Sequence, residues 1–248
     1  MASAHCYRDY YESTGHGDSL SPREQERIAS VLGKIPADVH TILELGCGDG
    51  RIASRLSNGR LVVGTDLSFR GLQSCSDQFK RVQSDIGQLP FADRSFDLVL
   101  CCEVLEHLPA AVFTAALREM DRLAKKYVLL SVPYLENLRE GSVRCPACGR
   151  PFHVYGHLRN FDDACFARLL PGFATPVIWK YGPISHWLAP LRWLRRFPNG
   201  GGRCLHCNAE SQQTELSLDQ KVVNWAHSNL VAPWHRKPYW IGGVFHRM

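Results

Sequence analysis

The sequence lacks any long apolar run. No stretch approaches the roughly 18 consecutive apolar residues that a bilayer-spanning helix needs. The N-terminal residues 1–19 are polar and aromatic, without the apolar segment of a signal peptide. We therefore expect a cytoplasmic protein with no transmembrane segment. Thiols stay reduced in that compartment, so paired cysteines are expected to bind metal rather than to form disulfides.

A strong charge of either sign is also missing. The 248 residues carry 29 Lys and Arg against 24 Asp and Glu, which gives a net charge of +5. A charge this small permits an anionic partner without requiring one, so it gives no clear indication of nucleic-acid binding. The chain is 45% hydrophobic and 21% charged, an ordinary globular composition with room for one large domain.

The chain shows no internal repeat, and short apolar runs alternate with helical periodicity from about residue 40 onward. Strands are predicted at 41–45, 61–67, 81–86, 96–104, 126–134, 174–182 and 237–248, and helices at 22–32, 51–56, 69–79, 110–124 and 162–170. Most of the strands are continuous apolar runs rather than alternating ones. This pattern favours an α/β fold with a parallel sheet covered by helices on both faces.

A glycine-rich turn, ELGCGDG (44–50), follows the first predicted strand. Glycine at Gly46 and Gly48 lets the chain turn sharply and lets a ligand approach the backbone. The GxGxG spacing differs from the GxGxxG pattern of pyrophosphate-binding turns. The acids Glu44 and Asp49 would repel a pyrophosphate, but they suit a cationic ligand.

Two further acids end neighbouring strands. Asp66 lies twenty residues after Gly46, where a carboxylate can accept hydrogen bonds from both ribose hydroxyls. Asp85 ends the third strand, at the same edge of the predicted sheet. Ligands of open α/β sheets bind at this edge, so the acids favour a nucleoside site over the alternative of a plain turn between strand and helix.

Four segments resemble the class I S-adenosylmethionine-dependent methyltransferases, type 11-like: ELGCGDG (44–50), GTDLS (64–68), SDIGQLPFADRSFDLVLCCEVLEHL (84–108) and HLRNF…LLPGF (157–173). The resemblance covers roughly residues 40–180 and the last strand. It implies a Rossmann-like sheet of seven mostly parallel strands with the last strand antiparallel.

The resemblance also implies how S-adenosylmethionine would bind. The expected contacts are Glu44, Gly46, Cys47 and Gly48 at the methionine end, Asp66 beside Leu67 at the ribose, Asp85 with Ile86 at the adenine, and Cys101 or Cys102 with Glu103 at the sulfonium. The sulfonium is positive and the cofactor has no phosphate, in agreement with a turn that carries acids and no lysine.

Methyl transfer needs the acceptor atom held in line with the methyl group, and an oxygen or nitrogen acceptor can also need a base. The candidates are Glu103 and His107, which follow the fourth strand, and His157, which follows the fifth. His107 has an alternative role in orienting its loop. Arg159 could hold an anionic group of the substrate or be an ordinary solvated charge. Tyr7, Tyr10 and Tyr11 could cover the site or pack on the surface.

Two CxxC pairs distinguish this sequence from the general family core. Cys145, Cys148, Cys204 and Cys207 would give four thiolates for a closed, tetrahedral zinc site. Fifty-five residues separate the pairs, so zinc would staple an insertion to the sheet rather than build a free finger. The alternatives are a histidine ligand (His153 or His206) in place of one thiolate, unpaired buried cysteines, or a redox pair.

These observations predict one domain over residues 1–248. Its parts are an N-terminal arm and helix (1–36), the cofactor-binding core (37–140), the zinc-knuckle insertion (141–210) and a C-terminal strand region (211–248). The basic, aromatic stretch 186–197 is expected to cover the zinc region, with membrane or lipid contact as the alternative.

The expected activity is methyl transfer from S-adenosylmethionine to a hydroxyl, or less readily an amine, of a small molecule, sugar or glycan. A vaguer resemblance of CPxCGxxFHxxGHLRxF to bacterial members in glycan and natural-product pathways suggests this acceptor class. The alternatives are an RNA methyltransferase that grips its substrate with the insertion, and a regulatory protein that binds the cofactor without turnover. The sequence gives no oligomeric state.

Overall fold

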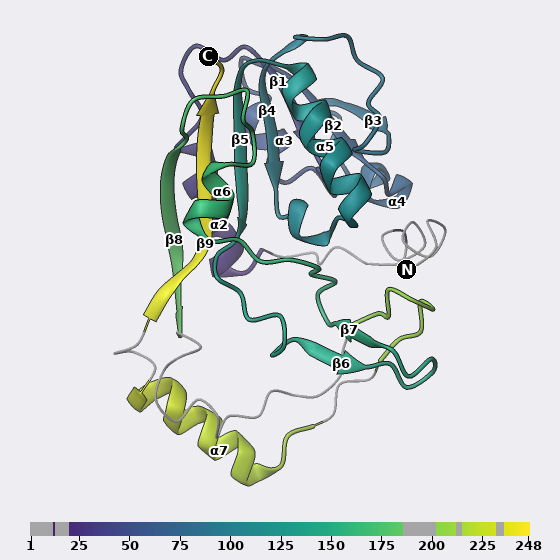
Figure 1. The fold of residues 1–248 in the computed structure, drawn as a ribbon, viewed down its shortest axis with the longest axis vertical. Coiled ribbons are helices and arrows are strands. Elements are labelled where there is room, and N and C mark those ends of the chain that lie inside the picture. The colour runs from purple at the N-terminus through teal and green to yellow at the C-terminus, as the bar shows by residue number, and fades with distance from the viewer. Residues whose placement is uncertain (1–11, 13–19, 186–201, 212–214, 232–235) are drawn as a thin grey trace.

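A seven-stranded sheet forms the centre of the molecule (Figure 1). The computed structural model describes residues 12, 20–185, 202–211, 215–231 and 236–248. The strands are β1 (Thr41–Leu45), β2 (Leu61–Asp66), β3 (Lys80–Gln83), β4 (Phe96–Cys102), β5 (Ala124–Pro133), β8 (Val177–Ser185) and β9 (Arg236–His246), in the order β3-β2-β1-β4-β5-β9-β8. β9 pairs antiparallel with both β5 and β8, and the other pairings in this sheet are parallel. The predicted Rossmann-like sheet with its last strand reversed is confirmed.

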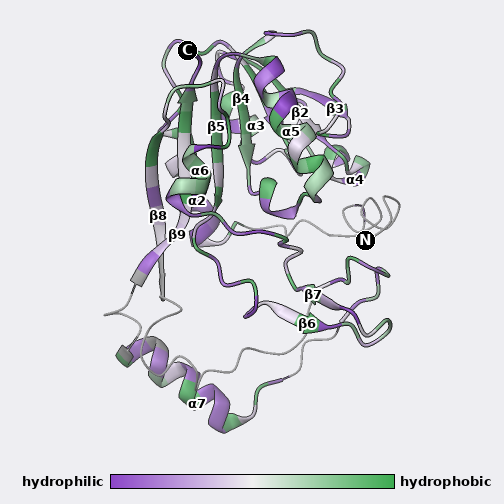
Figure 2. Ribbon diagram, in the orientation of Figure 1, coloured by the Kyte–Doolittle hydropathy of each residue, from purple (hydrophilic) through white to green (hydrophobic). Residues whose placement is uncertain are grey.

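The apolar runs form strands because both faces of the sheet are covered. Every residue of β4 is buried, and residues of alternate parity enter two separate cores. On one face lie α2 (Pro22–Leu32), α3 (Ala53–Leu56) and α4 (Phe69–Gln73); on the other lie α5 (Ala110–Leu123) and α6 (Asp163–Ala167). Figure 2 shows the central strands as a largely hydrophobic layer.

The helix expected at 22–32 has the predicted bounds and the predicted capping box, with Ser21 and Glu24 exchanging hydrogen bonds. The helix expected at 69–79 is wrong in length, because α4 ends at Gln73. After the helix ends, the ring of Phe79 packs beneath the glycine-rich turn. A Cβ on Gly50 or Gly64 would collide with this ring. Tertiary packing has shortened this helix.

A small hairpin lies outside the main sheet. It consists of β6 (Ser142–Arg144) and β7 (Pro151–His153), and Figure 1 shows it beyond the carboxyl-terminal ends of β4 and β5. The sequence patterns did not predict it, nor α7 (Leu218–Ala226) and the helical turn η3 (His227–Val231) that precede β9. The stretch 186–197 and the three tyrosines at 7, 10 and 11 fall outside the described residues. None of the described helices has the length and apolarity to cross a membrane.

Candidate active site

The glycine-rich turn after β1 packs against the segment that follows β4. Gly46 has a φ of 67°, and a Cβ there would collide with the side chain of Val104. Only glycine therefore permits both the backbone conformation and the close approach. The contact places the turn directly beside Glu103 and Val104, at the carboxyl-terminal edge of the two central strands.

Asp66, at the end of β2, organises the same turn. One oxygen of its carboxylate accepts the N–H of Gly48 at 2.8 Å, and the other accepts the N–H of Ser68 at 2.8 Å. A carboxylate has about four acceptor positions, so each oxygen keeps capacity for a ligand hydroxyl. Two backbone donors thus hold Asp66 at the end of β2, and its contact with the ribose stays a prediction.

Glu44 is a buried acid beneath the turn. Burial raises the pKa of its carboxyl to about 8, against the opposing effects of the Ala53 N–H and the Arg27 charge. Its Oε2 is buried without a hydrogen-bond partner among the described residues. An acceptor left open beside a glycine turn fits a ligand that brings ammonium or sulfonium charge, as S-adenosylmethionine does.

Replacing Glu44 with glutamine is expected to raise the free energy of unfolding of the cofactor-free protein at pH 9 but hardly at pH 4. The folded protein keeps a proton on Glu44 up to about pH 8, whereas the unfolded chain releases it near 4.5. The stability that this proton supports is full below 4.5 and is lost as the pH rises through 8. The gain at pH 9 should be about 5 kcal/mol, measured by urea denaturation.

The exposed Glu210 provides the matched control for that experiment, since its carboxylate pairs only at the surface with Arg203. Its replacement by glutamine should leave the pH dependence of unfolding unchanged. A stability difference between Glu44→Gln and wild type that stayed constant from pH 4 to pH 9 would contradict the buried, protonated state of Glu44.

The far end of the same edge has the half-buried side chains of Leu67 and Ile86. Asp85 is exposed, and its Oδ1 accepts the N–H of Gly87 at 2.8 Å. Glu12, from the N-terminal segment, accepts the N–H groups of Phe69 and Arg70 at the start of α4. The chain before α2 therefore reaches the rim of this edge.

Two cysteines predicted to contact the cofactor have their side chains in the core. Cys47 packs with the cluster on the α2 face, and Cys101 is fully buried in the cluster on the α5 face. A Cβ on Gly64 would collide with the Cys47 thiol, which shows how tightly it packs. Burial leaves both thiols little surface to offer a ligand, and their contact with the cofactor stays a prediction. The backbone of Cys47 belongs to the turn, whereas its side chain packs in the core.

Glu103 directly follows β4 and lies in the left-handed region, with a φ of 57°. A non-glycine residue in this conformation costs of the order of 1 kcal/mol and is often found at functional sites. The indole N–H of Trp240, in β9, donates to Oε2 of Glu103 at 2.7 Å, while Oε1 is buried without a partner among the described residues. Burial raises the pKa of Glu103 to about 7, although the charge of Arg27 opposes this.

Three histidines and two glutamates lie next to Glu103. Glu106 and His107 belong to the short turn η1 (Leu105–His107), and Glu136 follows β5. His157 forms a 2.5 Å hydrogen bond through Nδ1 to Glu136, and its ring lies 4.8 Å from that of His107 and 4.9 Å from that of His153. The two predicted histidines, His107 and His157, are thus brought together. Burial lowers the pKa of His107 to about 3.

Arg159 is engaged inside the protein. Its guanidinium lies 3.9 Å from the centre of the Phe113 ring and donates to the carbonyl of Leu108. Both contacts join the segment after β7 to the start of α5. They hold these two elements together, and the role of the half-buried Arg159 toward a substrate stays a prediction.

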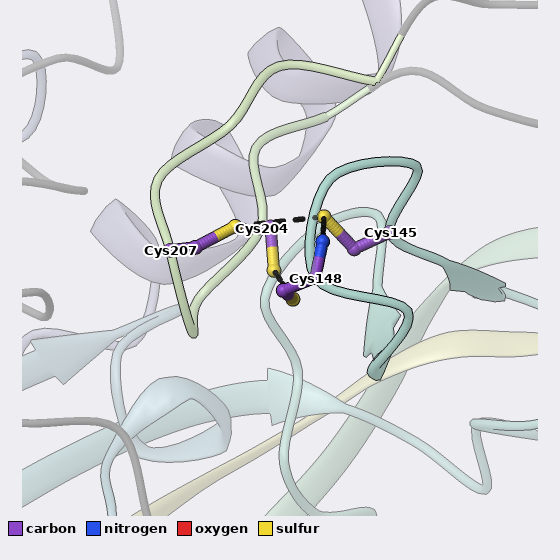
Figure 3. Close-up of side chains that lie close together, drawn as sticks. All are labelled: Cys145, Cys148, Cys204 and Cys207. Atoms are coloured by element: carbon purple, nitrogen blue, oxygen red, sulfur yellow. Dashed lines mark hydrogen bonds between the residues drawn. The ribbon is translucent and has the colours of Figure 1, made fainter.

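The four paired cysteines form one cluster (Figure 3). All four sulfur atoms lie within 4.8 Å of one another, with 3.5 Å between Cys145 and Cys207 and 3.7 Å between Cys148 and Cys204. All four are free thiols. A tetrahedral zinc ion with bonds of about 2.3 Å to sulfur separates its ligands by about 3.8 Å, so the spacing fits such an ion.

The two CxxC turns have the same backbone geometry. The residue after each second cysteine has a positive φ, 69° at Gly149 and 60° at Asn208. Its N–H donates to the carbonyl of the first cysteine, at 2.9 Å from Gly149 to Cys145 and 2.8 Å from Asn208 to Cys204. Backbone N–H groups also point at the sulfur atoms of both first cysteines. The cluster therefore consists of two equivalent knuckles.

Sequence reasoning missed several residues of this site. Arg27, in α2, is near enough to Glu103 and Glu44 that their charges outweigh the effect of burial and raise its pKa. Trp240 and Glu136 likewise contact predicted residues from distant parts of the chain. No local pattern marks any of the three. A possible signal for Glu136 was its position after the fifth strand, where the sheet edge collects ligand-binding groups.

Comparison with known proteins agrees with this geometry. Residues 43–132 match the family described as a methyltransferase domain. The 27-O-demethylrifamycin SV methyltransferase of Amycolatopsis mediterranei is 28% identical over 37% of this chain and 37% of its own length. The magnesium-protoporphyrin O-methyltransferase of Synechocystis sp. is 26% identical over 50% of this chain and 66% of its own length. The chain thus spans between about a third and two thirds of these curated relatives.

The whole described fold has counterparts among solved structures. The crystal structure of a SAM-dependent methyltransferase from Archaeoglobus fulgidus matches with a TM-score of 0.57 over 92% of this chain and 95% of that chain, at 16% identity. A likeness at this identity concerns the fold. Residues 43–132 therefore match a methyltransferase domain, and the described chain has the fold of a SAM-dependent methyltransferase.

Proposed function

We propose that this protein transfers a methyl group from S-adenosylmethionine to a hydroxyl group of a small molecule, sugar or glycan, with an amine as the less favoured acceptor. The observation that carries the proposal is the packing of the glycine-rich turn on the segment that holds Glu103, through Gly46 and Val104. The proposed cofactor cradle and the half-buried acid Glu103 thus lie at one edge of the sheet. The name of the Synechocystis relative, an O-methyltransferase, supports oxygen as the accepting atom.

The cofactor supplies an electrophilic methyl group when it is bound. Asp66 would accept the ribose hydroxyls, with Leu67 beside it and with Asp85 and Ile86 near the adenine. Arg27 would pair with the methionine carboxylate, and the open oxygen of Glu44 would accept from the ammonium group. These assignments place opposite charges at both ends of the amino-acid part of the cofactor.

Glu103 would accept the proton of the acceptor hydroxyl. Its pKa of about 7 suits a base near neutral pH, and Trp240 holds one oxygen so that the other remains available. His107, with a pKa of about 3, is a weak base. We therefore assign His107 and His157 to holding the acceptor, and Glu103 to the proton transfer.

Replacing Glu103 with glutamine is expected to lower methyl transfer by about 100-fold or more while leaving cofactor affinity nearly unchanged, because the amide keeps the shape but accepts no proton. Transfer would be measured by mass spectrometry, with labelled S-adenosylmethionine and panels of hydroxyl and amine acceptors. Affinity would be measured by calorimetry with S-adenosylhomocysteine.

Glu26→Gln, on the exposed side of α2, provides the control and should leave both quantities unchanged. Cofactor binding with no labelled product across both panels would contradict the proposed transfer and favour a regulatory role. Labelled RNA, bound with a steep dependence on salt, would favour the RNA alternative instead.

We further propose that Cys145, Cys148, Cys204 and Cys207 hold a structural zinc ion. The support is the spacing of their sulfur atoms and the matching backbone geometry of the two knuckles. Such an ion would have four protein ligands and no open position, so it would stabilise the β6–β7 hairpin without taking part in the chemistry. The hairpin carries His153 at its end, which links this staple to the histidine cluster.

A further inference from the structure

Beside Glu103 lies a set of ligand atoms that cofactor binding does not use. Glu106, His107 and His157 each present one nitrogen or oxygen atom, and these atoms lie within 4.8 Å of one another. Glu106 and His157 are buried, and His107 is half-buried. Two imidazoles and one carboxylate at this spacing are a ligand set typical of divalent transition metals.

Glu106 is the unusual member of the set. Its side chain is fully buried, and neither carboxylate oxygen has a hydrogen-bond partner among the described residues. A buried carboxyl group whose oxygens have no hydrogen-bond partner costs about 1–3 kcal/mol even when it carries a proton. A cation bound between Glu106 and the two imidazoles would remove that cost. The carboxylate is therefore explained better as a ligand than as a structural group.

The chain brings these three residues together by two local devices. The turn η1 follows β4 and presents Glu106 and His107 side by side at the sheet edge. The N–H of Leu158 then donates to the carbonyl of Glu106 at 2.7 Å, which draws the neighbouring His157 onto the turn. The backbone thus fixes the ligand positions from both sides.

Glu136 orients His157 as a metal ligand. Its carboxylate bonds to Nδ1 of His157 at 2.5 Å, which leaves Nε2 for a cation. Metal-bound histidines usually have such a partner on their second nitrogen. A rival site formed by Glu136, His153 and His157 would have to break this bond, whereas the oxygens of Glu106 are open. The packing of Gly141 against the His153 ring further restrains His153.

We propose that Glu106, His107 and His157 bind one divalent transition-metal ion, and that this ion holds the acceptor hydroxyl for methylation. The second half of this proposal rests on the proposed function. Three protein ligands leave positions open for a substrate oxygen. The ion would lower the pKa of the hydroxyl, and Glu103 would take its proton. The oxygen then bonds to the methyl carbon as the carbon–sulfur bond breaks, leaving a neutral thioether.

Manganese binding tests the site directly. Mn²⁺ favours oxygen and nitrogen ligands over the four thiolates of the knuckles, and its electron paramagnetic resonance signal reports the bound fraction. We expect the full chain to bind one Mn²⁺ at this site, and Glu106→Gln to weaken binding by about 100-fold. Glu44→Gln is the matched control, because it also neutralises a buried acid with an open oxygen, but outside the cluster. It should bind Mn²⁺ as the wild type does.

His157→Asn provides a second variant, with the same loss expected. Absence of Mn²⁺ binding by the wild type, or equal binding by Glu106→Gln, would overturn the site. Equal methylation rates for Glu106→Gln and wild type would overturn its part in the reaction. Mn²⁺ binding that is lost in Glu106→Gln supports the site even if no acceptor is methylated, and in that case only the proposed function fails.

Discussion

Replacing Asp66 with alanine is expected to weaken the binding of S-adenosylhomocysteine by about 100-fold or more. Hydrogen bonds to a charged acceptor contribute about 1.5–3 kcal/mol each, and two ribose hydroxyls would lose their partner. The variant also removes the acceptor for the N–H groups of Gly48 and Ser68, so the glycine-rich turn would lose its anchor. Isothermal calorimetry measures the affinity, and thermal unfolding measures the accompanying change in stability.

Asp77→Ala is the control, because Asp77 is an exposed carboxylate that pairs with Arg81 on the surface. It should bind the ligand like wild type and unfold at about the same temperature. If Asp66→Ala kept the wild-type affinity, the assignment of this sheet edge to the cofactor would be wrong, and with it the core of the proposed function.

Replacing Cys204 with serine is expected to remove one zinc ion per chain and to open the β6–β7 hairpin. Cys204 is fully buried between the two knuckles, and the cluster around it contains few apolar side chains besides Phe152. Structural zinc contributes about 10–16 kcal/mol in small zinc-dependent peptides. The few apolar contacts of this cluster do not supply a comparable free energy when the zinc is lost. Metal analysis measures the zinc, and amide exchange measures the loss of protection in the hairpin.

The exposed Cys165 lies outside the cluster, and Cys165→Ser should keep both the zinc and the protection. The difference in zinc content per chain between the two variants decides the test, because the site at Glu106 could also bind zinc. Equal zinc content in the two variants would contradict the four-cysteine site. Protection of β4 should be unchanged in both, because its core is independent of the hairpin.

The sheet was predictable because its strands are continuous apolar runs, and the direction of the last strand followed from the family resemblance. The turn after β1 was predictable for a different reason: glycine is needed at Gly46 both for its φ and for its contact with Val104. Local sequence therefore predicts the parts of the site that depend on backbone conformation. The bounds of the α2 helix belong to the same class, because its capping box is local.

The surroundings of Glu103 could not be predicted in this way. Its indole donor comes from Trp240, and the nearby cation comes from Arg27, so three distant segments meet only in the folded chain. The shortened α4 and the buried thiols of Cys47 and Cys101 have the same origin. Tertiary packing decides whether a side chain points toward the ligand or into the core. The periodicity of the sequence alone does not predict that direction.

The position of β9 has a consequence for the synthesis of this protein. It is the last strand along the chain, yet it pairs between β5 and β8. While a ribosome is still making residue 236, the sheet stops at β5, β8 has no partner in it, and Glu103 lacks the indole of Trp240. Synthesis must therefore proceed through β9 before the hydrogen-bond donor of Glu103 is in place.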